Sequence, residues 1–468
     1  MLTRLRIRNF KGWKDTGEIR LAPLTLFFGT NSSGKSSLGQ FLMLLKQTAE
    51  SPDRKAIFQP GGKNSAVQLG SFKEMVFRRK AENRISFDYQ WILPEPFSLK
   101  DPGTGRTLSG DALSFSAEVG GEGEEGLAPR QRRLSYQLFQ NGAARLKIGM
   151  SRKAGEGDEF VVSATPHKLK WKRRQRWPLG APIRFYGFPD EVAAYYQSAD
   201  FVQELNLQQE KLFRRLSYLG PLRTRAERLY SWTGTEPESV GHAGENAIAA
   251  LLAAKKREIS LKARGRSKPF EAVIADSLKK MGLIQRFKIN LISEQRHEYE
   301  VKVQVKGFDG GVDIPDVGFG VSQVLPVLVQ CFYAPQNSIV IMEQPEIHLH
   351  PLAQSALADV MIDVVNSREN GVDRNVQLLI ETHSEHFLRR LQRRVAEEAL
   401  PEEKVAAYFA KIGKAGSVLE ALEIDAGGNI RNWPDNFFGD EMADIAGQAK
   451  AALEKRIRQA TDKGEETE

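Results

Sequence analysis

The segment that most constrains this chain is a glycine-rich turn between an apolar strand pattern and an apolar helix pattern. Residues 29–36 read Gly-Thr-Asn-Ser-Ser-Gly-Lys-Ser, after the apolar run from Leu24 to Phe28 and before an apolar stretch that continues to Leu45. Such a turn lets successive backbone N–H groups surround phosphate oxygens, and the helix that follows adds the positive end of its dipole. A chance Gly/Ser turn is the alternative, but the strand and helix on either side favour a phosphate-binding loop.

The chemistry of this loop predicts a role for its polar residues. Lys35 would reach the β- and γ-phosphates of a nucleotide, and the hydroxyl of Ser36 would bind Mg²⁺. The residues that we expect around the phosphates are Gly29, Asn31, Ser32, Ser33, Gly34, Lys35, Ser36 and Ser37.

Composition places the chain among ordinary folded proteins. It has 468 residues, of which 41% are hydrophobic and 27% charged. No apolar run approaches the roughly 18 residues of a membrane span, and the first ten residues lack the apolar segment of a signal peptide. We therefore expect a cytoplasmic protein that does not cross a membrane. Its single cysteine, Cys331, lies in an apolar run and is expected to be a buried core residue in a reducing compartment.

The net charge of +8 is concentrated in two basic segments. In one, the cations of Lys168–Arg176 are interleaved with the tryptophans Trp171 and Trp177, and Lys255–Lys268 carries a second group of cations. Such surfaces attract phosphate backbones, and aromatic rings stack on unpaired bases, so both segments are candidates for DNA binding. A solvated basic loop or a face that docks an acidic protein explains them equally well.

Two buried strands are expected near the end of the chain, each followed directly by polar residues. Ser338–Met342 leads into Glu343, and Val376–Ile380 leads into the segment that contains His383. Open parallel sheets place their ligands at the carboxyl ends of such strands. The pattern therefore predicts that Glu343 and His383 lie near the phosphate loop.

A long insertion separates the phosphate loop from Glu343 in the sequence. We expect it to be an α+β or helical region. It begins with a Gly- and charge-rich stretch over Asp101–Arg130 that is expected to be a mobile excursion, and helices are predicted over Pro189–Arg215 and over Gly244–Lys268 and beyond.

In their order along the chain, these motifs resemble the ABC-type ATPases of the SMC/RecF/OLD (overcoming lysogenization defect) group, whose relatives include phage-defence proteins. The resemblance covers most of the chain. The segment Trp433-Pro434 with Phe437-Phe438 also resembles an uncharacterised C-terminal domain that some of these ATPases carry. The matching segments are Ile7-Arg8-Asn9-Phe10-Lys11, the phosphate loop, Gly318–Gln323, Glu343–Pro351 and Thr382-His383-Ser384.

The resemblance implies an α/β fold, namely an ABC-type P-loop ATPase head in which a mixed sheet is flanked by helices, with ATP and Mg²⁺ as cofactors. The large insertion would lie between the phosphate loop, known as Walker A, and the acidic strand end, known as Walker B. The implied divisions are 1–95 for the first part of the head, 96–310 for the insertion, 311–415 for the second part of the head, and 416–468 for a small C-terminal region.

The resemblance also implies roles at the acidic strand end. Glu343 corresponds to the acid that orients the water shell of Mg²⁺. Gln344 stands where the family usually has the glutamate that polarises the attacking water. A glutamine orients water through hydrogen bonds but does not accept its proton. We therefore expect slow ATP hydrolysis and a long-lived ATP-bound state, with Glu346 as a substitute base.

Three further elements of the family are matched. Gly318, Gly320 and Ser322 resemble the signature segment, which binds the γ-phosphate held by a partner subunit; an ordinary glycine-rich helix start is the alternative. The signature reading implies a head-to-tail dimer or a higher oligomer. His383 matches the histidine that senses the γ-phosphate, although a lone histidine is often structural. Gln68 is a weaker match to a glutamine that contacts Mg²⁺.

A metal site is an alternative interpretation of the acidic segment. Glu346, His348 and His350 alternate along the sequence, and alternate residues of an extended segment share a face. The ATPase motif already accounts for these residues, and no further cluster with metal-ligand spacing accompanies them.

The function expected from the resemblance is an ATPase that dimerises on ATP and acts as sensor or regulator of a separate effector, a nuclease or a toxin, in anti-phage defence. The segment after His383 is short and has no obvious DxD set for a nuclease of its own. A RecF/SMC-like DNA-repair ATPase and an ATP-dependent assembly scaffold with little hydrolysis are the alternatives.

Overall fold

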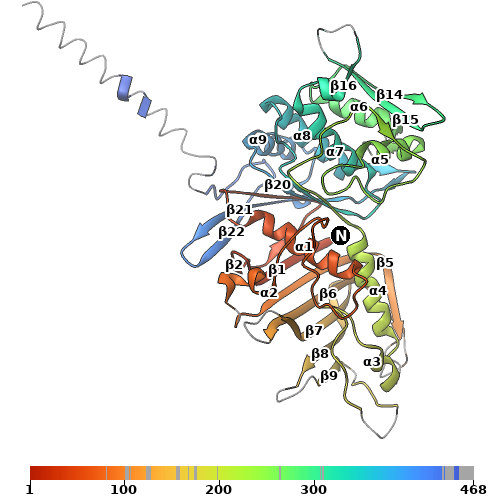
Figure 1. Ribbon diagram of the computed structural model, residues 1–468. Coiled ribbons are helices and arrows are strands. Elements are labelled where there is room, and N and C mark those ends of the chain that lie inside the picture. The colour runs from red at the N-terminus through yellow and green to blue at the C-terminus, as the bar shows by residue number, and fades with distance from the viewer. Residues whose placement is uncertain are drawn as a thin grey trace, which may run out of the picture.

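The computed structural model is shown in Figure 1. It describes residues 1–80, 82–100, 105, 107–122, 128–153, 159–166, 168–172, 177–197, 199–262, 265–305, 307, 310–434, 437, 447–448 and 450–452. Helices α5 to α9 gather at one end of the molecule and strands β5 to β9 at the other (Figure 1). Among the described residues, no helix is both long and apolar enough to cross a membrane.

A six-stranded sheet joins strands from distant parts of the sequence. Its order is β10-β17-β20-β4-β21-β22; neighbours from β10 to β21 are parallel, and β22 is antiparallel to β21. Continuous apolar runs such as those of β4, β17 and β20 are typical of parallel strands covered on both faces. The bounds are β4 (Leu24–Gly29), β10 (Leu216–Leu219), β17 (Ile339–Glu343), β20 (Gln377–Glu381), β21 (Val405–Gly413) and β22 (Gly416–Leu422).

The two faces of this sheet belong to two different cores, because successive side chains of a strand point to opposite faces. Ile341 and Leu379 pack with α1 (Lys35–Glu50) in the first core. Met342 and Ile380 pack in the second core with α7 (Phe319–Tyr333), α8 (Pro351–Val365) and α9 (Glu385–Ala396).

The first core is completed by an antiparallel sheet in the order β2-β1-β5-β6-β7-β8-β9, with β3 paired to β1. Helix α1 packs against it, since the ring of Phe41 meets those of Phe10 and Phe87 with centroids 5.1 and 5.0 Å apart. The bounds are β1 (Leu2–Phe10), β2 (Trp13–Asp15), β3 (Ile19–Arg20), β5 (Ile85–Lys100), β6 (Thr107–Glu122), β7 (Ala128–Gln140), β8 (Ala143–Arg152) and β9 (Phe160–Thr165).

This sheet changes two sequence expectations. The domain boundary expected at residues 95/96 falls inside β5, which pairs with β1 on one side and β6 on the other. It therefore does not coincide with the end of a structural layer. The predicted excursion Asp101–Arg130 is wrong for its described part, which forms β6 and the start of β7. Leu113, Phe115 and Ala117 are buried at alternate positions, so the strand signal was present among the glycines and charges.

The second core carries the remaining elements. Two small sheets have the orders β11-β15-β14, with β16 on β15, and β13-β12-β18-β19. The strand bounds are β11 (Tyr230–Ser231), β12 (Glu258–Ser260), β13 (Lys268–Pro269), β14 (Arg286–Ser293), β15 (Glu298–Gln304), β16 (Val312–Asp313), β18 (Arg368–Glu369) and β19 (Val372–Asp373). The other helices, some of which belong to the first core, are α2 (Phe72–Met75), α3 (Asp190–Tyr195), α4 (Phe201–Arg214), α5 (Ala247–Ala253), α6 (Phe270–Lys280) and the 3-10 turns η1 (Phe77–Arg79), η3 (Ala254–Lys256), η4 (Ile314–Asp316) and η5 (Glu402–Lys404).

Both helices predicted in the insertion need correction. The helix expected over Pro189–Arg215 is split into α3 and α4, because Tyr196 forms a β-bridge with Trp171 instead of a further helical turn. The helix expected over Gly244–Lys268 stops after η3, and the chain continues as β12, which pairs with β13 and β18. In each case pairing with distant residues overrides local helix propensity.

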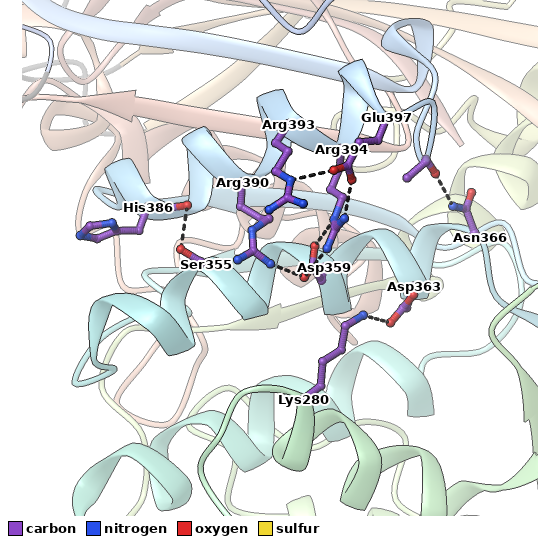
Figure 2. A network of polar contacts seen from close by, with 11 residues as sticks. Lys280, Ser355, Asp359, Asp363, Asn366, His386, Arg390, Arg393, Arg394 and Glu397 are labelled. Atoms are coloured by element: carbon purple, nitrogen blue, oxygen red, sulfur yellow. Dashed lines mark hydrogen bonds and ion pairs between the residues drawn. The ribbon is translucent and has the colours of Figure 1, made fainter.

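A buried carboxylate fixes α8 against α9 (Figure 2). Asp359 of α8 accepts hydrogen bonds from Arg390 Nη1 at 2.6 Å and from Arg394 Nε at 2.6 Å, both on α9. At the start of α9, the Ser384 hydroxyl caps the helix by accepting from Phe387 N at 3.0 Å. Helix α9 is therefore held firmly at the point where the His383 segment enters it.

Candidate nucleotide site

The phosphate loop has the glycines that its geometry demands. Gly29 ends β4 with φ 139°, and a Cβ there would lie 2.0 Å from the carbonyl oxygen of Ala410 on β21. Gly34 has φ 96° immediately before α1. Both conformations disfavour any residue with a side chain, so the loop matches the turn predicted from the sequence.

The ammonium group of Lys35 lies along the loop. Its Nζ donates to the carbonyl oxygens of Gly29 at 2.9 Å and Thr30 at 2.8 Å. Burial lowers the pKa of Lys35, and the charge of Glu381 opposes that change. The cation is thus held at the start of α1, where the helix dipole also favours an anion.

Trp13 contacts the phosphate loop and stabilises it. The sequence analysis did not select this residue because no motif marks it. Its indole is fully buried, and Nε1 donates to the Gly34 carbonyl at 3.1 Å and to the Ser37 hydroxyl at 2.9 Å. The Ser37 hydroxyl in turn donates to the Gly34 carbonyl at 2.5 Å. Ser37 therefore braces the loop in this structure, and its expected contact with phosphate stays a prediction.

Two carboxylates face the start of α1. Glu343 is the last residue of β17 and Glu381 the last of β20, and the two are direct partners in the parallel register. Their side chains line one cavity together with Lys35 and Ser36. The Tyr218 hydroxyl donates to Glu343 Oε1 at 2.7 Å. Glu381 and Tyr218 are site residues that the sequence analysis did not select.

Burial and the charge of a nearby carboxylate raise the pKa of both residues; the nearby carboxylate is Glu381 for Glu343 and Glu346 for Glu381. Burial raises the pKa of Glu343 to about 7, and the charge of Glu381 adds to the rise. Burial also raises the pKa of Glu381, while a hydrogen bond from Ser36 and the charge of Lys35 act in the opposite direction. Within the described part of the chain, Glu381 Oε2 is buried without a hydrogen-bond partner. Oxygen ligands with unsatisfied negative charge fit a hard cation such as Mg²⁺.

Hydrogen bonds to backbone groups fix the conformation of the turn that follows Glu343. Gln344 has φ 46°, and its N–H donates to the Glu381 carbonyl at 2.8 Å. Arg223 Nη2 donates to the carbonyl oxygens of Glu343 at 3.1 Å and of Gln344 at 3.3 Å. Arg223 is buried, and burial lowers its pKa to about 10. This arginine is a further residue that no sequence motif pointed to.

Glu346 joins the two polar strand ends. Its buried side chain accepts from the backbone N–H of His383 at 2.8 Å through Oε1. Burial raises the pKa of Glu346 despite that bond. Burial also lowers the pKa of His383, and the positive charge of Lys35 lowers it further, so a neutral imidazole is favoured near neutral pH. The predicted acidic and histidine residues thus meet beside the phosphate loop.

The chain matches the AAA ATPase domain family over residues 1–141 and 235–388. It belongs to that family. A second family, described as a protein of unknown function (DUF3696), matches residues 400–448. No curated protein matches the chain. Together with the observed sheet, family membership confirms the expected fold class, an ABC-type P-loop ATPase head with a mixed sheet flanked by helices.

Three solved structures similar to this ATPase domain are SMC heads. A head bound to the C-winged helix domain of ScpA is 10% identical with a TM-score of 0.43, and the match covers 91% of this chain and 98% of that one. The head from Thermotoga maritima is 9% identical, with a TM-score of 0.40 and coverage of 90% and 99%. A head with an extended coiled coil, bound to the C-terminal domain of ScpA from Pyrococcus furiosus, is 10% identical, with a TM-score of 0.42 and coverage of 90% and 96%.

Two groups of predicted residues lie away from the cavity that Lys35, Ser36, Glu343 and Glu381 line. Gly318 precedes α7, Ser322 donates to the Phe319 carbonyl at 3.0 Å within that helix, and Gly320 packs near Leu349. These three residues belong to the helical layer, and their role at a partner's nucleotide stays a prediction. Gln68 is exposed and borders a neighbouring opening, where its amide donates to the Lys63 carbonyl at 3.0 Å.

The alternative metal site finds no support in the geometry. His350 caps α8 by accepting from the Leu352 N–H at 3.4 Å, and His348 lies beside the Phe319 ring with centroids 6.0 Å apart. Glu346 is turned toward His383. Across the residues that the structure describes, no three His, Cys, Asp or Glu side chains are arranged to hold a metal ion.

Three cations of the two basic segments bind other parts of the fold. In Lys255–Lys268, Arg257 pairs with Glu369 at 2.7 Å and Lys268 with Asp276 at 2.7 Å. In Lys168–Arg176, residues 173–176 lie outside the described residues, and Lys172 donates to a backbone carbonyl at 2.7 Å. Binding of DNA by either segment stays a prediction. Cys331 is fully buried, which confirms its expected place in the core.

Proposed function

We propose that this protein binds ATP with Mg²⁺, hydrolyses it slowly, and assembles head-to-tail when ATP is bound. The observation that carries the proposal is that Lys35 and Ser36 share one cavity with Glu343 and Glu381. With a phosphate chain on the loop, Ser36 and Glu343 would hold the Mg²⁺ that accompanies it, as phosphoryl transfer requires. The bound metal would neutralise the charge that develops on the phosphoryl oxygens.

Each residue of the proposed ATP site then has a definite role. The loop amides and Lys35 bind the phosphates, and Tyr218 holds Glu343 in place through its hydrogen bond. Arg223 fixes the backbone of Gln344, whose side-chain amide orients the attacking water without taking its proton. His383, as a neutral imidazole, donates a hydrogen bond to the γ-phosphate.

Slow hydrolysis follows from the absence of a proton acceptor at residue 344. Glu346, the substitute base named above, is held through Oε1 by the His383 N–H and is buried. In this arrangement Glu346 positions the His383 segment through Oε1, and its other oxygen, Oε2, is buried without a hydrogen-bond partner among the described residues. General base catalysis typically contributes about 10² to 10⁴-fold, so its loss would leave ATP bound for a long time.

A partner subunit is expected at the surface that begins with Gly318. Beside this glycine, the side chain of Phe319 is 69% exposed, and Leu352 is 67% exposed. Phe319 also contacts His348 of the turn that follows the acidic strand end. Exposed apolar side chains next to a glycine-initiated helix suit the docking of a second phosphate loop. Gly320 and Ser322 would then complete the partner's nucleotide site.

In the cell, we propose that ATP-dependent assembly makes this ATPase a sensor or regulator of a separate nuclease or toxin in anti-phage defence. The order of the motifs supports this role. Gln344 equally favours a scaffold that assembles on ATP and hydrolyses little. The exposed Lys255 and Lys256 favour the third candidate, a RecF/SMC-like ATPase that binds DNA.

ATP turnover and mass in solution, measured with and without duplex DNA, separate these roles. The variants are Lys35→Ala and Gln344→Glu beside the natural sequence. The sensor or scaffold predicts slow turnover, assembly that Lys35→Ala abolishes, and faster turnover in Gln344→Glu. Turnover that is stimulated by DNA would favour the repair ATPase. Fast turnover that Gln344→Glu does not improve would contradict the proposed role of Gln344.

A further inference from the structure

The end of β20 carries a carboxylate that the recognised motifs leave without a role. Glu381 lies directly opposite Glu343 in the parallel register of β20 and β17. Neighbouring strands lie about 4.8 Å apart, and side chains at partnered positions point to the same face. Leu379 and Ile341, two residues earlier on each strand, both pack in the first core, so the two carboxylates project toward α1 together.

The surroundings of Glu381 contain no ion pair that would neutralise it. Among the described residues, no lysine, arginine or histidine nitrogen is recorded in an ion pair with its carboxylate. The ammonium of Lys35, whose charge acts on Glu381, donates to the carbonyls of Gly29 and Thr30. Buried charges in proteins are paired with an opposite charge or bind a metal ion.

The hydrogen bonds around the pair leave oxygens available. Tyr218 occupies Glu343 Oε1, and the Ser36 hydroxyl lies within reach of both carboxylates, although its one hydrogen serves only one of them at a time. Glu381 Oε2 is buried and has no hydrogen-bond partner within the described chain. Mg²⁺ in nucleotide sites is commonly held by one or two carboxylates together with phosphate oxygens and water. An oxygen that is buried, charged and unpartnered beside the Ser36 hydroxyl meets that requirement.

We propose that Glu381 is the second carboxylate of the divalent-cation site, and that it acts with Glu343 and Ser36 on the metal that accompanies ATP. This inference rests on the proposed ATP-binding function and names a ligand that the motifs did not. The bond from the Gln344 N–H to the Glu381 carbonyl ties the same residue to the turn that positions water. Glu381 thus connects the metal to the water-binding turn.

The test is the affinity of the full chain for Mn²⁺, measured by electron paramagnetic resonance with a non-hydrolysable ATP analogue present. Glu381→Gln and Glu343→Gln are compared with the natural protein and with Glu385→Gln. Glu385 lies four residues further on, at the surface of α9, and pairs with Arg389, so its variant controls for the loss of one charge. We expect Glu381→Gln to weaken Mn²⁺ binding at least about tenfold, which is the lower end of what losing even an outer partner costs. Glu385→Gln should change nothing.

A second measurement shows that the variant is folded. In EDTA, a fluorescent ATP analogue should bind Glu381→Gln as tightly as the natural protein or more tightly, since a carboxylate that repels phosphate has been removed. Adding Mg²⁺ should strengthen analogue binding by the natural protein much more than by Glu381→Gln.

The outcomes separate this inference from the function on which it rests. Mn²⁺ binding by Glu381→Gln that equals that of the natural protein, while Glu343→Gln binds weakly, would overturn the role of Glu381 and leave the ATPase intact. Failure of the natural protein to bind the analogue with Mn²⁺ would overturn both. If Glu381→Gln does not fold, Glu381→Asp keeps the charge on a shorter side chain, and unchanged Mn²⁺ affinity in it would count against direct contact.

Discussion

Two groups of buried carboxylates in this protein have opposite electrostatic settings. Asp359, between α8 and α9, is held by Arg390 and Arg394 (Figure 2), and hydrogen bonds and positive charge hold its pKa below the usual value against the effect of burial. Glu343 and Glu381 form no ion pair within the described chain, and burial raises the pKa of both although the charges of Lys11 and Lys35 act in the opposite direction. The first carboxylate stabilises the fold, whereas the second pair is arranged for a ligand that brings positive charge.

The largest expected difference between the two groups is in activity. Glu343→Gln should lower ATP turnover by roughly a thousandfold, because a metal ion typically supplies several kcal/mol of transition-state stabilisation. The same change should leave the melting temperature unchanged or higher, since it removes a repulsive charge. Steady-state turnover and a thermal melt check both. A variant that is unstable as well as inactive would mean that Glu343 is a structural carboxylate like Asp359.

The pH dependence of stability should have opposite signs at the two places. The pKa of Glu343 is raised from 4.5 to about 7, so the folded state binds the proton more tightly than the unfolded state. Its contribution is favourable at low pH and is lost as the pH rises from 4.5 through about 7, by at most about 3 kcal/mol. Urea unfolding without metal, at pH 5 and pH 8, measures this loss. The difference between the two pH values should shrink in Glu343→Gln; an unchanged difference would show that other groups cause it.

Asp359→Asn should reduce stability and spare catalysis. Removing one partner of a buried network leaves Arg390 and Arg394 poorly paired, and we expect a loss of about 2 kcal/mol. Because the pKa of Asp359 is lowered, its contribution is present above 3.8 and is lost as the pH falls through its folded value. The control is Asp276→Asn, whose surface pair with Lys268 should contribute less than about 1 kcal/mol. Equal losses in the two variants would remove the distinction between buried and surface pairs.

The smallest effect is expected beneath the phosphate loop. Trp13→Phe keeps the aromatic ring but removes the N–H that bonds Gly34 and Ser37. We expect a loss of about 1 kcal/mol in stability and a several-fold weaker binding of ATP. Binding of a fluorescent ATP analogue is the readout. Trp232→Phe is a matched control, because its indole donates to the Thr235 carbonyl near the surface. A loss of affinity in both variants would mean that the Trp13 hydrogen bonds have no special role.

The sequence could predict those parts of the site that contiguous residues form. Gly29 to Gly34 form a turn that leads directly into α1, and Glu343 and His383 lie at the ends of apolar runs that are typical of buried strands. Glu381 was visible in the same segment as His383, but its importance depends on β20 lying next to β17 in a register that pairs it with Glu343. That neighbour relation is a property of the fold.

The remaining site residues come from the insertion and from the first strands. Tyr218 and Arg223 reach the acidic strand end because β10 joins the sheet beside β17, although it is 120 or more positions earlier in the chain. No local sequence pattern predicts such a contact. Strand β6 and the start of β7 were missed for a different reason: their outward faces are rich in Ser, Gly and charge, which concealed the alternation on the inward face.

The order of strands in the six-stranded sheet also determines when the phosphate loop can be completed while the protein is being synthesised. β4 is made near the start of the chain, yet its neighbours β20 and β21 are made near the end, and Ala410 of β21 packs on Gly29 of the phosphate loop. A nascent chain that has not yet emerged past residue 410 therefore lacks one wall of the loop. The phosphate loop is therefore complete only after β21 has joined the sheet beside β4.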